Sequence, residues 1–165
     1  MPLPSLIVYE RTGAWAQAVR RELGRAGFTP VPRVVECRSS VECRRLFSGA
    51  SGVGGAAQAM FVVESACDRA GDACELLHDH LRRFPRVPRF VVGAASNVDY
   101  EPLYREWGAL AMLTSPRALK PLVNVYRRYC ELSHGERPDD LSEQSQSQSL
   151  TEHFQASLPW GRVAR

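Results

Sequence analysis

The sequence lacks the long apolar runs, paired cysteines and nucleophile motifs that define several large classes of protein. No apolar run approaches the roughly 18 residues that a membrane-spanning helix needs. Residues 1–5 carry neither a basic segment nor a cleavable hydrophobic region, so we expect a cytoplasmic protein that makes no membrane contact. The five cysteines include no Cys-x-x-Cys spacing, which favours reduced thiols that act as small apolar side chains.

The length and the charge balance favour one globular domain with a short extension. A chain of 165 residues, 44% of them hydrophobic and 24% charged, is long enough to bury a core of its own. The net charge of +3 is weakly basic, whereas a nucleic-acid binder usually carries a dense basic stripe. We therefore expect no direct nucleic-acid binding.

Apolar segments of strand length alternate with amphipathic segments of helix length along the first 132 residues. Ser40 caps the second helix, and Pro30 and Pro32 place the second strand late or at a sheet edge. Five strand-helix units predict an α/β fold with a five-stranded parallel sheet, helices on both faces and any ligand site at the carboxyl ends of the strands. The expected strands are 6–9, 33–36, 59–63, 90–92 and 110–113, and the expected helices are 15–26, 40–47, 72–84, 100–107 and 117–132.

The sequence offers two cofactor signals, and neither predicts a bound cofactor or metal. Residues 49–55 hold four glycines but lack the Lys-Ser/Thr pair of a phosphate-binding loop, which favours a flexible connector. His78 and His80 lie two positions apart on an expected helix, so they point to different faces and form no shared metal site. We expect His78 on the apolar side of this helix and His80 in solvent.

The composition changes after the last expected helix, which divides the chain into a domain at 1–134 and a tail at 135–165. The first half of the tail is polar and contains the run Ser-Gln-Ser-Gln-Ser, which predicts disorder. Residues 150–163 become apolar again, and this segment either docks on a partner or forms a short helix that folds back on its own domain. Its docking side chains are Phe154, Leu158 and Trp160.

Three local patterns follow one another at the ends of the expected strands. Residues 6–11 combine an apolar strand with an acidic ending, and residues 74–94 combine a helix, a proline turn and a strand. Residues 108–116 read Gly-Ala-Leu-Ala-Met-Leu-Thr-Ser-Pro, with serine before the proline. In this order they resemble the receiver domain of response regulators, the CheY-like family, in which a lysine precedes that proline. The resemblance implies a flavodoxin-like fold of receiver type and a place in two-component signalling and phosphorelays.

The resemblance also implies a phosphorylation pocket, and this sequence has replaced its essential groups. Working receivers hold Mg²⁺ with two acidic residues, phosphorylate an aspartate, and bind the phosphoryl oxygens with Thr or Ser and with Lys. A metal site containing Arg11 would bring like charges together, and Glu64 is one methylene longer than the aspartate nucleophile. We therefore expect a pseudo-receiver that is not an enzyme, takes up no phosphoryl group and holds no cofactor. The altered positions are Glu10 and Arg11 at the metal site, Glu64 at the nucleophile, Gly93 at the hydroxyl and Ser115 at the lysine.

Two interpretations of this altered pocket stay open. In one, Arg11 replaces the metal and forms an ion pair with Glu64 or Glu10, which locks the domain in one conformation. In the other, the pocket has drifted after losing its role, and these side chains are solvated at a loop edge. An Arg11→Ala substitution distinguishes them, because it would destabilise a locked domain by roughly 1 kcal/mol or more.

Receivers signal through the fourth helix, the fifth strand and the fifth helix, so the resemblance implies an interaction surface there. Met112 occupies the position of an aromatic switch, where it either fills the core or makes an adaptable contact. Basic residues in and just before the last helix favour an acidic protein partner. These residues are Arg117, Lys120, Arg127 and Arg128.

The leading hypothesis is a non-phosphorylatable protein-protein interaction module in bacterial signalling or transcriptional regulation. Its expected partner is a histidine kinase, a regulator or a second copy of the chain. The alternative is a small-ligand sensor or an enzyme of flavodoxin-like fold that uses the crevice at the strand ends, because one fold hosts many functions.

Overall fold

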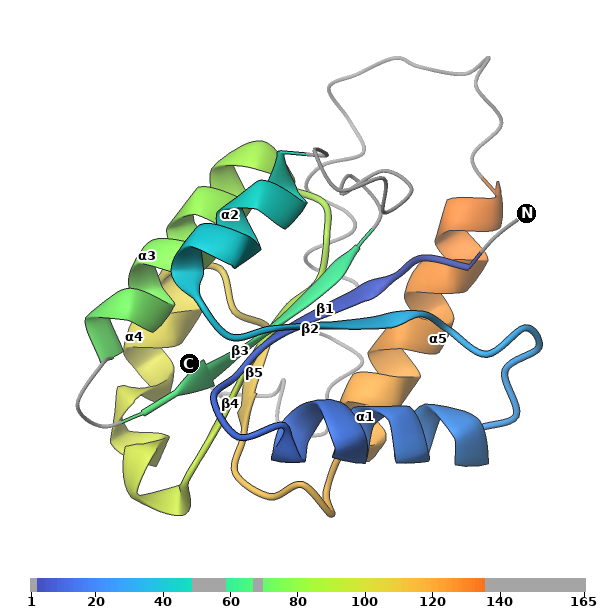
Figure 1. Ribbon diagram of the computed structural model, residues 1–165, viewed down its shortest axis with the longest axis horizontal. Helices are drawn as coiled ribbons and strands as arrows, with labels where there is room; N and C mark the ends of the chain where they lie inside the picture. The colour runs from blue at the N-terminus through green and yellow to red at the C-terminus, as the bar shows by residue number, and fades with distance from the viewer. Residues whose placement is uncertain (1–2, 49–58, 67–69, 136–165) are drawn as a thin grey trace, which may run out of the picture.

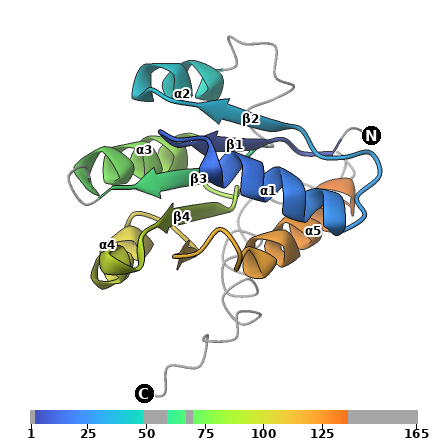
Figure 2. The same ribbon diagram turned by 60° about the horizontal axis from the view of Figure 1, so that its bottom comes forward.

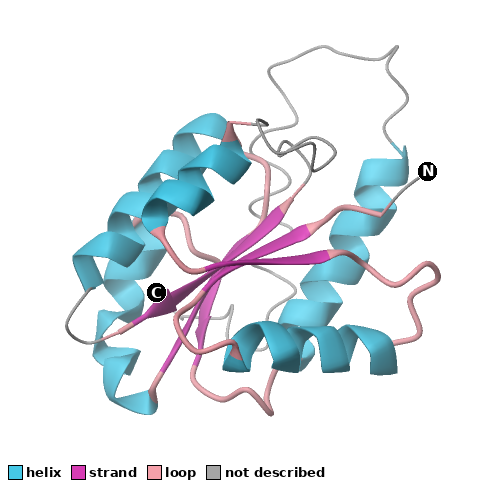
Figure 3. Ribbon diagram, viewed as in Figure 1, coloured by secondary structure: helices cyan, strands magenta, loops and turns pink. Residues whose placement is uncertain are grey.

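Five parallel strands form a single sheet in the computed structural model, which describes residues 3–48, 59–66 and 70–135 (Figures 1 and 3). Their order is β2-β1-β3-β4-β5. The chain enters next to the centre at β1, adds β2 at one edge, and then adds β3, β4 and β5 in turn toward the other edge. The predicted α/β class and parallel sheet are confirmed, and the second strand lies at the edge. The strands are β1 (Leu6–Tyr9), β2 (Val34–Cys37), β3 (Met60–Ser65), β4 (Arg89–Gly93) and β5 (Ala111–Leu113).

Helices cover both faces of this sheet, as predicted (Figure 2). The first and last helices pack on one face, and the others pack on the opposite face. No helix in the described part of the chain is long and apolar enough to cross a membrane. The helices are α1 (Ala14–Arg25), α2 (Ser40–Phe47), α3 (Ala70–Arg83), the 3-10 helix η3 (Ala95–Tyr100), α4 (Glu101–Glu106) and α5 (Lys120–Gly135).

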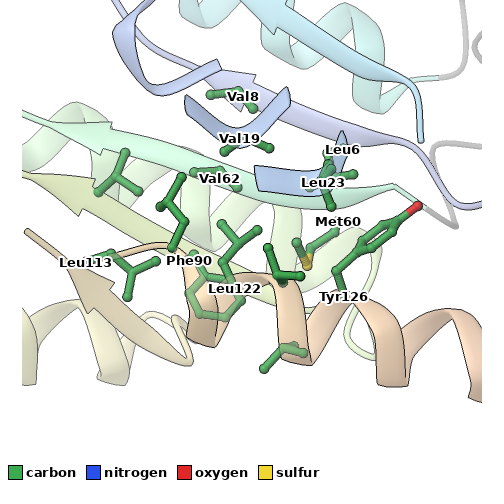
Figure 4. Packing of buried hydrophobic residues seen from close by; sticks show 14 of the residues in the cluster. Leu6, Val8, Val19, Leu23, Met60, Val62, Phe90, Leu113, Leu122 and Tyr126 are labelled. Atoms are coloured by element: carbon green, nitrogen blue, oxygen red, sulfur yellow. The ribbon is translucent and has the colours of Figure 1, made fainter. Parts of the chain in front are cut away.

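Strict alternation along the strands divides the core into two layers. In β3, Met60 and Val62 face α1 and α5, whereas Phe61 and Val63 face α2, α3 and α4. Figure 4 shows part of the first layer, in which Phe90 of β4 lies beside Leu122 of α5. Because both faces of every central strand are buried, these strands are continuous apolar runs.

The helix boundaries correct the sequence prediction in three places. Ser39, not Ser40, caps α2, because its extended backbone lets its hydroxyl accept the N–H of Glu42 at 3.1 Å. The helix expected at 100–107 is present as α4, but an additional 3-10 helix, η3, which the sequence did not predict, precedes it. The last helix begins at Lys120 rather than 117, because a turn after β5 comes first. Residues 49–55 and the tail beyond 135 lie outside the described residues, so the domain division stays a prediction.

The prediction that His80 lies in solvent is wrong, and His78, expected on the apolar side, is half-buried with its ring against Trp107. His80 is fully buried and stacks on Phe61, with ring centroids 5.0 Å apart, whereas His78 is only half-buried. The buried side of α3 includes Cys74 and Leu77, and it extends to Ala73, Leu76 and His80. Burial, aided by the nearby Arg89 cation, lowers the pKa of His80 to about 3.

Arg89, the first residue of β4, is a buried cation that holds two helix ends together. Its guanidinium donates to the carbonyl oxygens of Phe84 at 2.8 Å, Pro85 at 3.1 Å and Gly108 at 3.0 Å. These carbonyls follow the C-termini of α3 and α4, where helix dipoles favour positive charge. Burial lowers the pKa of Arg89 to about 10, which still leaves it charged at neutral pH.

Candidate functional site

Glu10 follows β1 directly and its side chain is fully buried. Its two carboxylate oxygens accept the backbone N–H groups of Trp15 at 2.7 Å and Ala16 at 2.6 Å. These N–H groups belong to the first turn of α1, where helix donors are unpaired and the dipole attracts an anion. Burial raises the pKa of Glu10, and the two backbone hydrogen bonds oppose that rise. Both oxygens are therefore committed to capping α1.

Arg11 and Glu64 are joined through the backbone. The N–H of Arg11 donates to Oε2 of Glu64 at 2.8 Å, while the Arg11 side chain is exposed. Arg38 donates from Nη1 to the carbonyl oxygen of Arg11 at 3.3 Å, which holds the same loop from the β2 side. Within the described ranges no ion pair links the Arg11 guanidinium to Glu64 or Glu10. This contact differs from both the ion-pair lock and the solvated pocket. The loop is fixed by a hydrogen bond from the Arg11 backbone to Glu64, and the Arg11 guanidinium takes no part in it.

Gly93 ends β4 beside Ser65, its register partner on β3. A Cβ atom at Gly93 would lie 2.7 Å from the Ser65 carbonyl oxygen and 3.3 Å from Cε of Met112. Real Cβ atoms essentially never approach backbone oxygen so closely. The packing therefore excludes a serine or threonine at this position unless the strands move apart. Met112 is buried against the space that a hydroxyl-bearing side chain would need.

A buried polar cluster occupies the end of β3. Ser65, Asn97 and Tyr104 are each almost completely buried. The Ser65 hydroxyl forms a short hydrogen bond with the hydroxyl of Tyr104, and the Asn97 amide donates to the Ser65 carbonyl oxygen at 2.8 Å. The cluster ties η3 and α4 to the central sheet. Asn97 and Tyr104 were not among the predicted site residues; a polar and an aromatic residue following a strand end were the available signal.

Ser115 serves the turn before α5. Its hydroxyl oxygen accepts the N–H of Arg117 at 3.3 Å, and its carbonyl oxygen accepts the N–H of Ala118 at 3.0 Å. Arg21 of α1 donates to the next carbonyl oxygen, that of Pro116, at 3.2 Å. The residue at the family's lysine position is therefore part of a local turn.

The four basic residues in and just before α5 differ in their exposure and in their contacts. Arg117, Lys120 and Arg127 are exposed, and Arg128 is half-buried. Arg127 lies over the Phe28 ring, 5.6 Å from its centroid, and donates to the Ala26 carbonyl oxygen at 3.3 Å, just beyond α1. A shallow hollow of about 440 Å³ is lined by Asn124, Arg127, Arg128, Glu131 and Leu132. The predicted tail residues Phe154, Leu158 and Trp160 lie outside the described residues.

The donor set at the strand ends does not fit Mg²⁺. This ion requires several oxygen ligands in a near-octahedral arrangement, usually including a carboxylate. Both Glu10 oxygens already accept N–H groups, and Arg11 puts a cation beside them in sequence. Across the ranges that the structure describes, no three His, Cys, Asp or Glu side chains are grouped to hold a metal ion.

The strand order and the distribution of helices define the CheY-like receiver fold, which the sequence predicted. A response regulator receiver domain protein from Clostridium thermocellum superposes with a TM-score of 0.59 at 16% identity, covering 80% of this chain and 98% of that one. The phosphorylated cyanobacterial phytochrome response regulator RcpA gives 0.58 at 18% identity, covering 82% and 99%. The Mn²⁺-bound response regulator Rcp1 gives 0.51 at 17% identity, covering 76% and 91%. No protein-family model matches the chain, and no curated protein sequence matches it significantly.

Proposed function

We propose that this chain is a cytoplasmic receiver-fold module that takes up no phosphoryl group, has no enzymatic activity and acts by protein-protein interaction in bacterial signalling or transcriptional regulation. Glu10 carries the proposal, since both of its oxygens accept N–H groups of α1. The similar structures include a phosphorylated receiver and a Mn²⁺-bound one. In this chain the acid at the matching position caps a helix and Arg11 replaces the second acid, which removes one of the two carboxylates that would hold the ion.

The other altered positions support the same function, because each contributes to packing or hydrogen bonding. Glu64 holds the Arg11 backbone, Gly93 allows β4 to approach Ser65, and Ser115 shapes the turn before α5. Tyr104 bonds α4 to Ser65 of β3, which holds the fourth helix against the sheet. We therefore infer that the domain keeps one conformation and that its partners bind this conformation.

The partner surface that we propose is the basic side of α5. Arg127 and Arg128 form no ion pair with a carboxylate among the described residues, so their charge is available to an acidic partner. A histidine kinase, a regulator or a second copy of this chain could supply such a surface.

A phosphodonor assay tests the chemical part of the proposal. The full chain is incubated with acetyl phosphate and Mg²⁺ beside a receiver that retains its aspartate, and intact masses are measured. We expect the control protein to gain about 80 Da, one phosphoryl group, and this chain to keep its mass. Trp15, whose backbone N–H donates to Glu10, contributes to the tryptophan fluorescence of the chain, which we expect Mg²⁺ to leave unchanged. A stable adduct on Glu64 would refute the proposal.

A charge-reversal experiment tests the surface. The double variant Arg127→Glu with Arg128→Glu is compared with Arg82→Glu and Arg83→Glu, an exposed arginine pair in α3 that undergoes the same charge change. Binding of a fluorescent poly-glutamate peptide is measured at low and high salt. We expect the α5 variant to lose most of the salt-sensitive binding and the α3 variant to keep it. If both variants lose the same amount of peptide binding, the peptide responds to the net charge of the protein and not to a site on α5.

A further inference from the structure

Two thiols that are distant from any motif meet at the edge of the sheet. Cys37 ends β2 and Cys43 lies in α2, and both are fully buried. Their Sγ atoms are 3.3 Å apart, and Cys37 Sγ also lies 3.7 Å from the carbonyl oxygen of Val8. Ser39 starts α2 just after the strand, so the helix brings Cys43 back over the end of β2. Their separation of six positions does not match a redox motif, which is why the sequence did not reveal the contact.

We propose that Cys37 and Cys43 are a modification site, a dithiol that a peroxide oxidises to an intrachain disulfide. A disulfide bond measures about 2.05 Å, so the sulfurs must approach by roughly 1.2 Å from their present contact. The edge position of β2 and the eight-residue length of α2 favour this movement, because a short peripheral helix can shift with little disruption of the central sheet (Figure 2).

The chemistry proceeds in two balanced steps. The Cys37 thiolate attacks one oxygen of hydrogen peroxide, the O–O bond breaks, and a sulfenic acid and water form after protonation. The Cys43 sulfur then attacks the Cys37 sulfur, the S–O bond breaks, and a second water leaves as Cys43 loses its proton. Burial, together with the contact with Cys37, raises the pKa of Cys43, so we assign the first attack on peroxide to the other thiol of the pair.

The burial of both thiols also predicts the kinetics. A peroxide reaches them only when α2 opens from the sheet, so oxidation should be slow and should accelerate when α2 is loosened. The product ties α2 to β2 and restrains this opening. The inference concerns the opposite sheet edge from α5 and is independent of the proposed partner surface.

Tryptic mapping of the full chain tests this site. Arg38 lies between the cysteines, so trypsin places them on separate peptides, 34–38 and 39–44. After native treatment with hydrogen peroxide and alkylation of free thiols, we expect these two peptides to appear linked and lighter by two hydrogens. Cys74, which is also buried but forms no thiol–thiol contact within the described part of the chain, should remain alkylated.

Single variants provide the control. Cys37→Ser and Cys43→Ser should each abolish the linked peptide, and dimedone should trap a sulfenic acid on Cys37 in the second variant. If either variant fails to fold, the wild-type map alone still decides. Recovery of both cysteines as alkylated thiols while Cys74 is oxidised, or a linkage that joins a different pair, would overturn the proposal.

Discussion

The buried imidazole of His80 makes the stability of this protein sensitive to mild acid. His80 lies among the rings of Phe47, Phe61 and Phe84, and its Nδ1 is 3.4 Å from Nη1 of Arg89. An arginine only donates hydrogen bonds, so Nδ1 must accept and the ring must be neutral. Protonation would place a second cation beside Arg89 in the core, where no water solvates it.

The pKa values set the size of this effect. The folded-state pKa of about 3 lies below the ordinary value of 6.5, so the unfolded chain binds the proton more tightly. Stability is therefore retained above pH 6.5 and lost as the pH falls toward 3. Between pH 7 and pH 5 linkage predicts a loss of about 2 kcal/mol in the free energy of unfolding from this residue alone.

Urea unfolding at pH 7 and pH 5 measures the loss, with His80→Phe as the test variant and His78→Phe as the control. Phenylalanine suits the aromatic surroundings of His80 and cannot be protonated. We expect the His80 variant to lose about 2 kcal/mol less between the two pH values than the wild type and the His78 variant do. The reasoning fails if the three proteins lose stability equally, or if the His80 ring titrates near pH 6.5 by NMR.

Three substitutions test the packing at the strand ends. Gly93→Ala should lower the free energy of unfolding by about 1–3 kcal/mol, because the new Cβ meets a backbone oxygen. Its control, Gly24→Ala, adds a Cβ in open space on α1 and should raise the free energy of unfolding by about 0.5–1 kcal/mol. Urea midpoints that shift in the same direction in both variants would contradict this reasoning. Tyr104→Phe removes the hydrogen bond between the Tyr104 and Ser65 hydroxyls and should lower the free energy of unfolding, measured by thermal unfolding, by about 1–3 kcal/mol. A decrease as small as that caused by removing the hydroxyl of an exposed tyrosine would refute a stabilising role for this bond. Arg11→Ala should change stability by less than about 0.5 kcal/mol, since only its backbone contacts Glu64; a cost of about 1 kcal/mol or more would restore the ion-pair lock.

The order of elements could be predicted from sequence because strand and helix signals are local. Apolar runs such as 59–63 alternate with amphipathic segments along the chain, and a helix between successive strands provides the crossover that parallel pairing requires. The carboxyl-end location of the site follows from the same alternation. The helix boundaries were predicted less accurately. Ser39 and Ser40 are both suitable capping residues, and only the backbone geometry shows that Ser39 caps α2.

The side-chain environments could not be predicted, because they depend on neighbours from other elements. Histidine occurs both in cores and on surfaces, so its residue type did not indicate that the buried side of α3 extends to His80. Nothing in the local sequence indicates that a backbone oxygen of β3 lies where Gly93 would carry a Cβ. The contact between Cys37 and Cys43 likewise needs the turn of α2 over the sheet edge.

The sequence by itself determined that this protein builds a five-unit α/β domain and that its strand ends carry Glu10, Arg11, Glu64, Gly93 and Ser115 in place of the family's phosphorylation groups. Only the tertiary structure decided how these residues are used. A carboxylate becomes a metal ligand or a helix cap according to which groups surround it. In this chain, the first turn of α1 supplies two N–H groups to Glu10, so its buried carboxylate caps the helix.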